Sequence, residues 1–63
     1  MKLNKEKYLL ARANACMSAK DLINAGIPRD TLYRAERRDL RPETVGKIAR
    51  ALGVDVTEII ETN

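Results

Sequence analysis

Apolar residues recur at helical spacing along this chain, and the same start signal precedes three of the apolar runs. Asn4, Ser18 and Asp55 are residue types that cap helix N-termini, and an apolar residue stands directly before each of them. A second apolar residue follows five positions after the first, which is the spacing of a hydrophobic staple. Two of the starts also approximate capping boxes, with Asp21 and Glu58 as the acidic members. The staple pairs are Leu3 with Tyr8, Met17 with Leu22, and Val54 with Ile59.

Prolines and glycines supply the remaining boundaries. Pro28 and Pro42 suit the first turn of a helix, where the missing N–H has no intrahelical partner. Gly26 and Gly53 stand where two helices are expected to stop. Because no segment alternates for long enough to form a strand, the predicted class is all-α, a single compact domain over residues 1–63. Its predicted elements are five short helices, over residues 4–15, 18–25, 28–37, 42–52 and 55–61.

The same spacing predicts the core, since residues three and four positions apart share one face of a helix. Small side chains dominate it, and no Phe or Trp contributes. The expected core residues are Tyr8, Ala11, Ala15, Leu22, Ile23, Ile27, Leu32, Ala35, Val45, Ile48, Ala49, Leu52, Val54, Ile59 and Ile60.

Composition narrows the chemistry. Cys16 is the only cysteine among 63 residues and there is no histidine, which excludes a disulfide within the chain and argues against a zinc site. We expect Cys16 to be a small buried or half-buried apolar residue. The sequence has no phosphate-cradling glycine loop and no metal-ligand cluster. It therefore predicts a protein that is not an enzyme and needs no cofactor.

The chain also lacks the signals of membrane targeting. No apolar stretch approaches the roughly 20 residues that span a bilayer, and the N-terminal MKLNKEKY has no signal-peptide core. The sequence therefore predicts a soluble, cytoplasmic protein with no membrane partner.

The positive charge is concentrated in one part of the chain. The net charge is only +3, from 12 basic and 9 acidic residues, so bulk charge says little about partners. Five arginines, however, lie between Arg29 and Arg41, whereas the stretch after Ala51 is acidic and contains no basic residue.

On a helix that starts at Pro28, the apolar and basic residues of this arginine-rich stretch separate. Leu32 and Ala35 fall on one side, and Arg29 and Arg37 on the other. An arginine fork matches the O6 and N7 acceptors of guanine in the major groove. Exposed arginines at helical spacing are also common on plain solvated helix faces, so the pattern by itself leaves both interpretations open.

The sequence around these arginines favours contact with DNA over a plain solvated helix face. MSAKDLINAGIPRDTLYRAERRDLRP, followed by KIARALGVDVTEII, resembles the helix-turn-helix of the phage repressor and Cro family, which includes the xenobiotic-response-element regulators of bacteria. In this resemblance Ser18 is the cap, Gly26 the turn glycine and residues 28–37 the recognition helix. The family commonly carries glutamine where this chain has Ala19 and glycine where it has Arg38. The resemblance implies a compact five-helix, lambda-repressor-like DNA-binding domain.

The resemblance also implies roles for individual residues. Arg12 and Glu36 match family positions that often form a structural ion pair. Asp30 also suits the dipole of a helix N-terminus, and Tyr33 also suits a half-buried structural position, so both keep a second interpretation. The implied base-contacting residues are Arg29, Asp30, Tyr33 and Arg34. The expected phosphate-contacting residues are Ser18, Lys20, Thr31, Arg37, Arg38 and Arg41.

The function expected from these features is sequence-specific binding of double-stranded DNA by a transcriptional regulator, of the kind found as phage or mobile-element repressors. It would read the major groove as a homodimer on a pseudopalindromic operator. Residues 54–63 are a candidate dimer surface, unless the monomer core uses Ile59 and Ile60. No small-molecule ligand is expected in this domain. The alternative is a protein-interaction module, such as an antitoxin or anti-repressor, on a helix-turn-helix scaffold.

Overall fold

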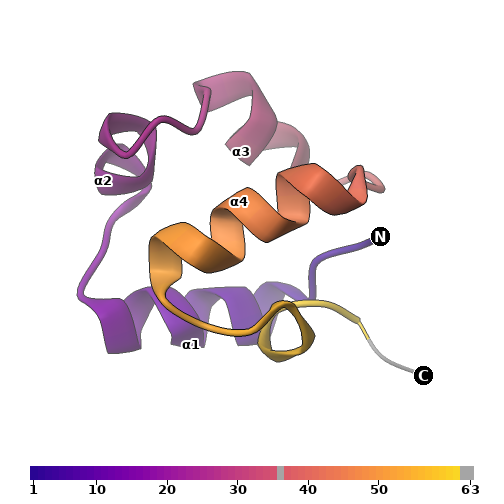
Figure 1. Cartoon of the computed structure of the whole chain (residues 1–63), viewed down its shortest axis with the longest axis horizontal. Helices are drawn as coiled ribbons and strands as arrows, with labels where there is room; N and C mark the ends of the chain where they lie inside the picture. The colour runs from indigo at the N-terminus through magenta and orange to yellow at the C-terminus, as the bar shows by residue number, and fades with distance from the viewer. Residues whose placement is uncertain (36, 62–63) are drawn as a thin grey trace.

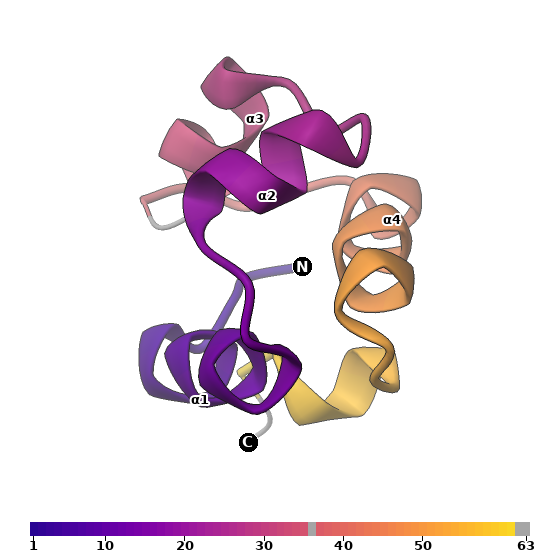
Figure 2. The ribbon, with the colours of Figure 1, turned by 90° about the vertical axis from the view of Figure 1, so that its left-hand side faces the viewer.

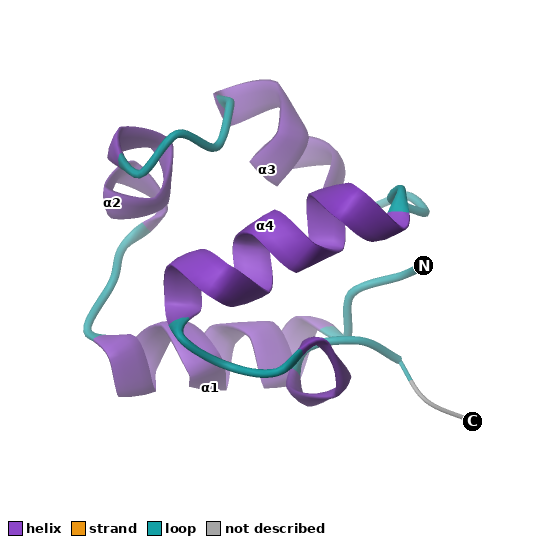
Figure 3. Ribbon diagram, viewed as in Figure 1, coloured by secondary structure: helices purple, strands orange, loops and turns teal. Residues whose placement is uncertain are grey.

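The computed structural model describes residues 1–35 and 37–61. In this part of the chain the elements are α1 (Lys5–Ala15), α2 (Ala19–Asn24), α3 (Arg29–Ala35), α4 (Pro42–Leu52) and a single 3-10 turn, η1 (Val56–Glu58). The described residues form no strand, so the predicted all-α class is confirmed (Figure 3). None of their helices has the length and apolar character needed to cross a membrane.

The four helices enclose one apolar core. In Figure 1, α1 runs along the bottom of the molecule, α2 and α3 lie at the top, and α4 passes between them. Figure 2 shows the same separation from the side, with η1 next to α1 at the end opposite α2 and α3. The arrangement leaves α3 at the edge of the molecule, with one face directed toward the core and the other outward.

The helix starts lie where the capping residues predict them. The side chain of Asn4 accepts a hydrogen bond of 3.0 Å from the N–H of Lys7. Ser18 and Asp21 form a reciprocal capping box at α2. Asp55 and Glu58 do the same at η1, and Pro42 is the first residue of α4. These boundaries follow from sequence because every cap depends only on residues within one helical turn.

Three helices end in the same hydrogen-bond pattern, in which one residue takes a positive φ. After α2, Gly26 N–H donates to Ile23 and Ile27 N–H to Leu22, with φ at Gly26 of 107°. After α4, the residue with positive φ is Gly53, at 72°. This is the Schellman arrangement, which satisfies the last carbonyls of a helix. Both glycines were predicted to end these helices, and their positive φ values explain why glycine suits these positions.

At the third such turn, which ends α1, the residue with positive φ is Cys16. Its N–H donates to Ala13, the N–H of Met17 donates to Arg12, and its φ is 55°. The expectation of a buried or half-buried Cys16 is wrong, because the side chain at this position of the Schellman turn is exposed. Cys16 is the only non-glycine residue with a positive φ in the described part of the chain.

The predicted fifth helix is mostly not a helix. Residues 56–58 make one 3-10 turn, after which Ile60 forms an antiparallel bridge with Leu3. The C=O of Ile59 accepts from Asn4 N–H, and Glu61 N–H donates to the C=O of Lys2, both at 2.9 Å. Since these backbone groups bond to the N-terminal segment, they are not available to continue a helix.

The third helix is also shorter than the predicted 28–37. It covers Arg29–Ala35, and the C=O of Pro28 accepts from the N–H of Leu32 at 3.2 Å. Arg37 and Arg38 lie in a turn, where both N–H groups donate to the C=O of Arg34. These two arginines therefore belong to the exit from α3.

The core largely follows the helical spacing. Of the fifteen expected core residues, eleven are buried; Ala15, Ile23, Val54 and Ile60 are half-buried against them. Leu3 is a buried residue that the core prediction omitted, because its burial requires the pairing with the distant Ile60. The complete burial of Ile59 and half-burial of Ile60 show that the monomer core uses both residues of the candidate dimer segment.

Candidate functional site

The outward face of α3 displays the residues that sequence reasoning assigned to base contact. Arg29, Asp30, Tyr33 and Arg34 are all exposed, while Leu32 and Ala35 are buried on the opposite face. Burial of only two side chains fixes the helix on the core and leaves the rest of its length free. The amphipathic pattern of the sequence is therefore present in three dimensions.

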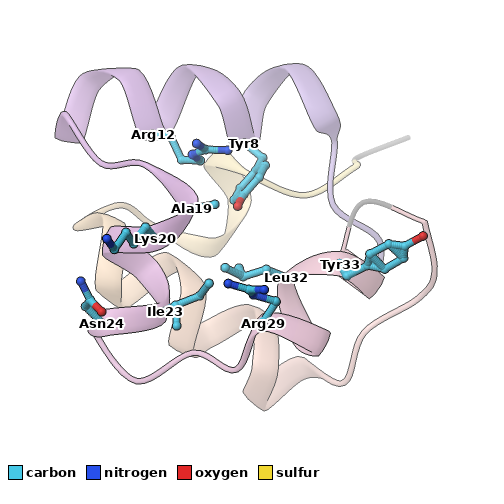
Figure 4. A pocket seen from close by; sticks show the side chains of 9 residues that line it. All are labelled: Tyr8, Arg12, Ala19, Lys20, Ile23, Asn24, Arg29, Leu32 and Tyr33. Atoms are coloured by element: carbon cyan, nitrogen blue, oxygen red, sulfur yellow. The ribbon is translucent and has the colours of Figure 1, made fainter.

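A hollow of about 700 Å³ lies on one flank of α3, between α1, α2 and α3 (Figure 4). We call it the α2-side hollow. Three cations, Arg12, Lys20 and Arg29, come from three different helices to line it, and none of its lining residues is acidic. Its remaining lining residues are Tyr8, Ala19, Ile23, Asn24, Leu32 and Tyr33.

Arg12 is held in place within this hollow by its own helix end. Its Nε donates to the C=O of Met17 at 3.2 Å, and its guanidinium lies 5.5 Å from the centre of the Tyr8 ring. The predicted ion pair of Arg12 with Glu36 lies outside the described residues, because Glu36 is not among them. The bond to Met17 and the contact with the Tyr8 ring fix where the Arg12 guanidinium lies in the hollow.

A second hollow, of about 430 Å³, lies on the other flank of α3, next to the start of α4. We call it the α4-side hollow. Arg34, Arg38 and Arg41 line it together with one acid, Asp39. Its other lining residues are Thr31, Leu40 and Thr44. Arg41 is the N-cap residue of α4 and makes no side-chain cap bond, so its guanidinium is not used to start that helix.

Tyr33 and Arg37 form a stacked pair on the outer surface of α3. The Arg37 guanidinium lies 4.7 Å from the centre of the Tyr33 ring, and Tyr33 is 56% exposed. At exposed sites such a cation–π contact contributes about 0.5–1 kcal/mol. The exposure of Tyr33 excludes the half-buried structural position that the sequence left open for it. The stacking contact also keeps Arg37 beside the residues predicted to contact bases, although Arg37 lies beyond the end of α3.

Ser18 differs from the other predicted phosphate-contacting residues, because its hydroxyl already has a partner. It donates to the Asp21 carboxylate at 3.1 Å and accepts from the Asp21 N–H at 3.2 Å. The Ser18 backbone N–H that donates to this carboxylate lowers the pKa of Asp21, and the Ser18 hydroxyl and the nearby Lys20 act in the same direction. A charged Asp21 therefore stands next to Ser18. Lys20, two residues after Ser18, lines the edge of the α2-side hollow instead (Figure 4).

The sequence predicted most of the basic residues at α3 but not how they are grouped. Arg12 was assigned a structural role, and its position in the α2-side hollow beside Arg29 was not foreseen. The two residues are far apart in the chain, and no local pattern links them. Asn24 also lines this hollow and carried no sequence signal of a role.

The described residues contain no group of three His, Cys, Asp or Glu side chains that could hold a metal ion. Comparison of the chain with known family models, curated proteins and solved structures finds no match.

Proposed function

We propose that this protein is a sequence-specific regulator of transcription that binds double-stranded DNA, with α3 in the major groove. In this proposal α2, the turn over residues 25–28 and α3 are the helix-turn-helix. The observation that supports it most strongly is the position of α3 between the two basic hollows, each lined by three cations.

The geometry of B-DNA explains why two flanking hollows matter. The major groove is about 12 Å wide, admits one α-helix and has a phosphate backbone along each edge. A helix that reads the bases therefore needs positive charge on both flanks, and the phosphate contacts fix its register. A plain solvated helix face carries no such requirement for cations on both sides.

The roles of the residues follow from their places around α3. Arg29 and Asp30 lie in the first turn, the end of a recognition helix that meets base edges. Tyr33 and Arg34 follow along the same outward face. The proposed phosphate contacts are Arg12, Lys20, Thr31, Arg37, Arg38 and Arg41. Ser18 contributes through the cap of α2, because its hydroxyl is bonded to Asp21.

Salt dependence of binding to random duplex DNA tests the electrostatic part of this proposal. If the five cations proposed to contact phosphates each neutralise one, log K should fall with log[salt] with a slope of about −4.5 per protein molecule. The variant Arg38→Ala should make the slope shallower by about one, and the matched control Arg50→Ala, on the exposed face of α4, should leave it unchanged. No binding at low salt would overturn the proposal in favour of the protein-interaction alternative.

Selection of bound sequences from a random duplex pool tests the sequence-specific part. Two copies on one site should select two half-sites related by two-fold symmetry, with centres one helical turn apart. A single module buries only about 600–1,000 Å² on DNA, so we expect a homodimer to be needed for tight binding. Recovery of random sequence would show that binding is electrostatic only and would contradict a regulatory role.

A further inference from the structure

Arg37 and Arg38 are adjacent in the chain, but their side chains serve different flanks of α3. Arg38 lines the α4-side hollow. The guanidinium of Arg37 lies 4.7 Å from the centre of the Tyr33 ring, and Tyr33 lines the α2-side hollow. Figure 4 shows the Tyr33 ring at the opposite end of this hollow from Lys20. The contact with Tyr33 therefore adds a cation to the α2 flank.

The backbone at Arg37 fixes where its side chain begins but not where the guanidinium goes. Arg37 lies beyond the last residue of α3, in a turn where its N–H donates to the C=O of Arg34 at 2.9 Å. The residue is exposed, and arginine has many rotamers at an exposed position. The contact with the Tyr33 ring selects among these rotamers and holds the guanidinium on one side of the helix end.

A ring orders an arginine without neutralising it. An ion pair with a carboxylate would place a negative charge beside the guanidinium and use its N–H donors. An aromatic ring attracts the cation through its quadrupole and carries no net charge. The guanidinium has five N–H donors in a planar fork that matches a phosphate. Tyr33 therefore holds Arg37 in a form that suits an anionic ligand.

The Tyr33 ring contributes little to the core. Tyr33 is 56% exposed, whereas Leu32 and Ala35 of the same helix are buried. Removal of the ring should therefore leave the fold intact, so that its effect on binding can be measured separately from stability.

We infer that Tyr33 is a positioning residue, whose ring holds Arg37 against the phosphate backbone on the α2 side of the major groove while Arg38 contacts the backbone on the other side. The inference rests on the proposed function, because it takes double-stranded DNA as the ligand. It gives Tyr33 a role that is exerted through Arg37, in place of the base contact expected from the sequence.

Loss of the ring should weaken DNA binding, because a mobile arginine must then be ordered in the complex. Immobilising one side chain with many rotamers costs about two- to tenfold in affinity. Tyr33→Leu should therefore weaken binding to random-sequence duplex DNA at low salt by about two- to tenfold. The salt slope should stay the same, because Arg37 keeps its charge. Arg37→Ala should instead make the slope shallower by about one.

A double-mutant cycle tests whether Tyr33 acts through Arg37. In the Arg37→Ala background, Tyr33→Leu should cause no further loss of affinity. In the Arg38→Ala background, which is the matched control, Tyr33→Leu should cause its full loss, because Arg38 lies on the other flank. Tyr33→Phe keeps the ring without the hydroxyl and should retain the coupling with Arg37. Circular dichroism checks that the helices of all variants are intact.

NMR of the protein without DNA provides a second measurement. The ring current of Tyr33 should shift the δ-methylene protons of Arg37 upfield, and Tyr33→Leu should abolish this shift. Absence of the shift would overturn the inference. So would unchanged affinity of Tyr33→Leu, an additional loss in the Arg37→Ala background, or a loss confined to a selected DNA site. Failure of the unaltered protein to bind duplex DNA would overturn the proposed function together with this inference, whereas the other outcomes leave DNA binding in place.

Discussion

The helices α3 and α4 have similar sequences in one respect and opposite roles in the fold. Both combine apolar residues at helical spacing with arginines or lysines. α4 has 11 residues and buries four of them, with Val45 and Ile48 fully enclosed. α3 has seven residues and buries only Leu32 and Ala35. α4 therefore forms much of the core, whereas α3 is attached to it.

The difference shows why charge on a helix is weak evidence of function until its surroundings are known. Lys47 and Arg50 of α4 are as exposed as many residues of α3, but the small hollows beside them are lined mainly by Gly26, Ile27 and other small or apolar residues. Arg29 of α3 shares its hollow with cations of α1 and α2. Arg34 shares the other hollow with Arg38 and Arg41, which lie in the connection from α3 to α4. A seven-residue helix is unstable by itself in water, so its attachment to the core is what presents this face.

The largest loss of stability should come from truncating a buried side chain of α4. Ile48→Ala removes a fully buried side chain and should lower the free energy of unfolding by about 3–4 kcal/mol. Leu32→Ala in α3 should cost less, about 2 kcal/mol, because its site is at the margin of the core and can partly close. Urea unfolding followed by circular dichroism measures both. Equal losses would mean that α3 is as deeply built into the core as α4, contrary to the comparison.

The next largest effect is a loss of DNA affinity without a loss of stability. Arg34→Ala should leave the unfolding free energy unchanged and weaken binding to a selected DNA site by about 1–3 kcal/mol, with relaxed preference at one base position per half-site. Arg50→Ala, on the exposed face of α4, is the control and should bind normally. Titration against the selected site and single-base variants measures this. The same loss on every sequence would show that Arg34 contacts only phosphate, as its place in the α4-side hollow permits.

A smaller effect distinguishes the C-terminal ends of α1 and α4, which share one backbone pattern but not one residue type. Cys16→Gly should raise the unfolding free energy by about 1 kcal/mol, because glycine removes the cost of a left-handed conformation from an exposed position. Gly53→Ala should lower it by a similar amount, and added Cβ atoms there would meet no neighbour within 4 Å, so the loss is conformational. Thermal unfolding should show shifts of about 4–8 °C in opposite directions. A destabilised Cys16→Gly would indicate a packing role for the thiol.

The smallest expected effect is the loss of stability at low pH that comes from the capping carboxylates of α2 and η1. Hydrogen bonds from Ser18 lower the pKa of Asp21, and hydrogen bonds from the Thr57 hydroxyl and N–H lower the pKa of Asp55. A carboxyl whose pKa is lower in the folded state stabilises the fold above its unfolded pKa of about 3.9, and this stability is lost as pH falls through the folded value. Unfolding midpoints should therefore decline below about pH 4. The double variant Asp21→Asn and Asp55→Asn should show a weaker decline, and an unchanged decline would assign acid sensitivity to other carboxyls.

Much of the fold could be predicted because its signals are local. The capping residues Asn4, Ser18 and Asp55 each act within one turn, and Gly26 and Gly53 end their helices through hydrogen bonds of similarly short range. The exposed face of α3 followed from the same periodicity that placed Leu32 in the core. The predicted lengths of α3 and of the last element were wrong, because a start signal does not determine how far a helix continues. The predicted burial of Cys16 was also wrong.

The sequence by itself determined the helix starts, the two glycine turns, nearly all of the core and the face that α3 turns outward, since each depends on neighbours within a few positions. Tertiary structure alone decided that Leu3 pairs with Ile60, and this pairing limits the last helix to a single turn. It also decided that Arg12 and Arg29 share one hollow. The physical reason is that burial and electrostatic grouping depend on which distant segments meet, and no periodicity along the chain encodes those meetings.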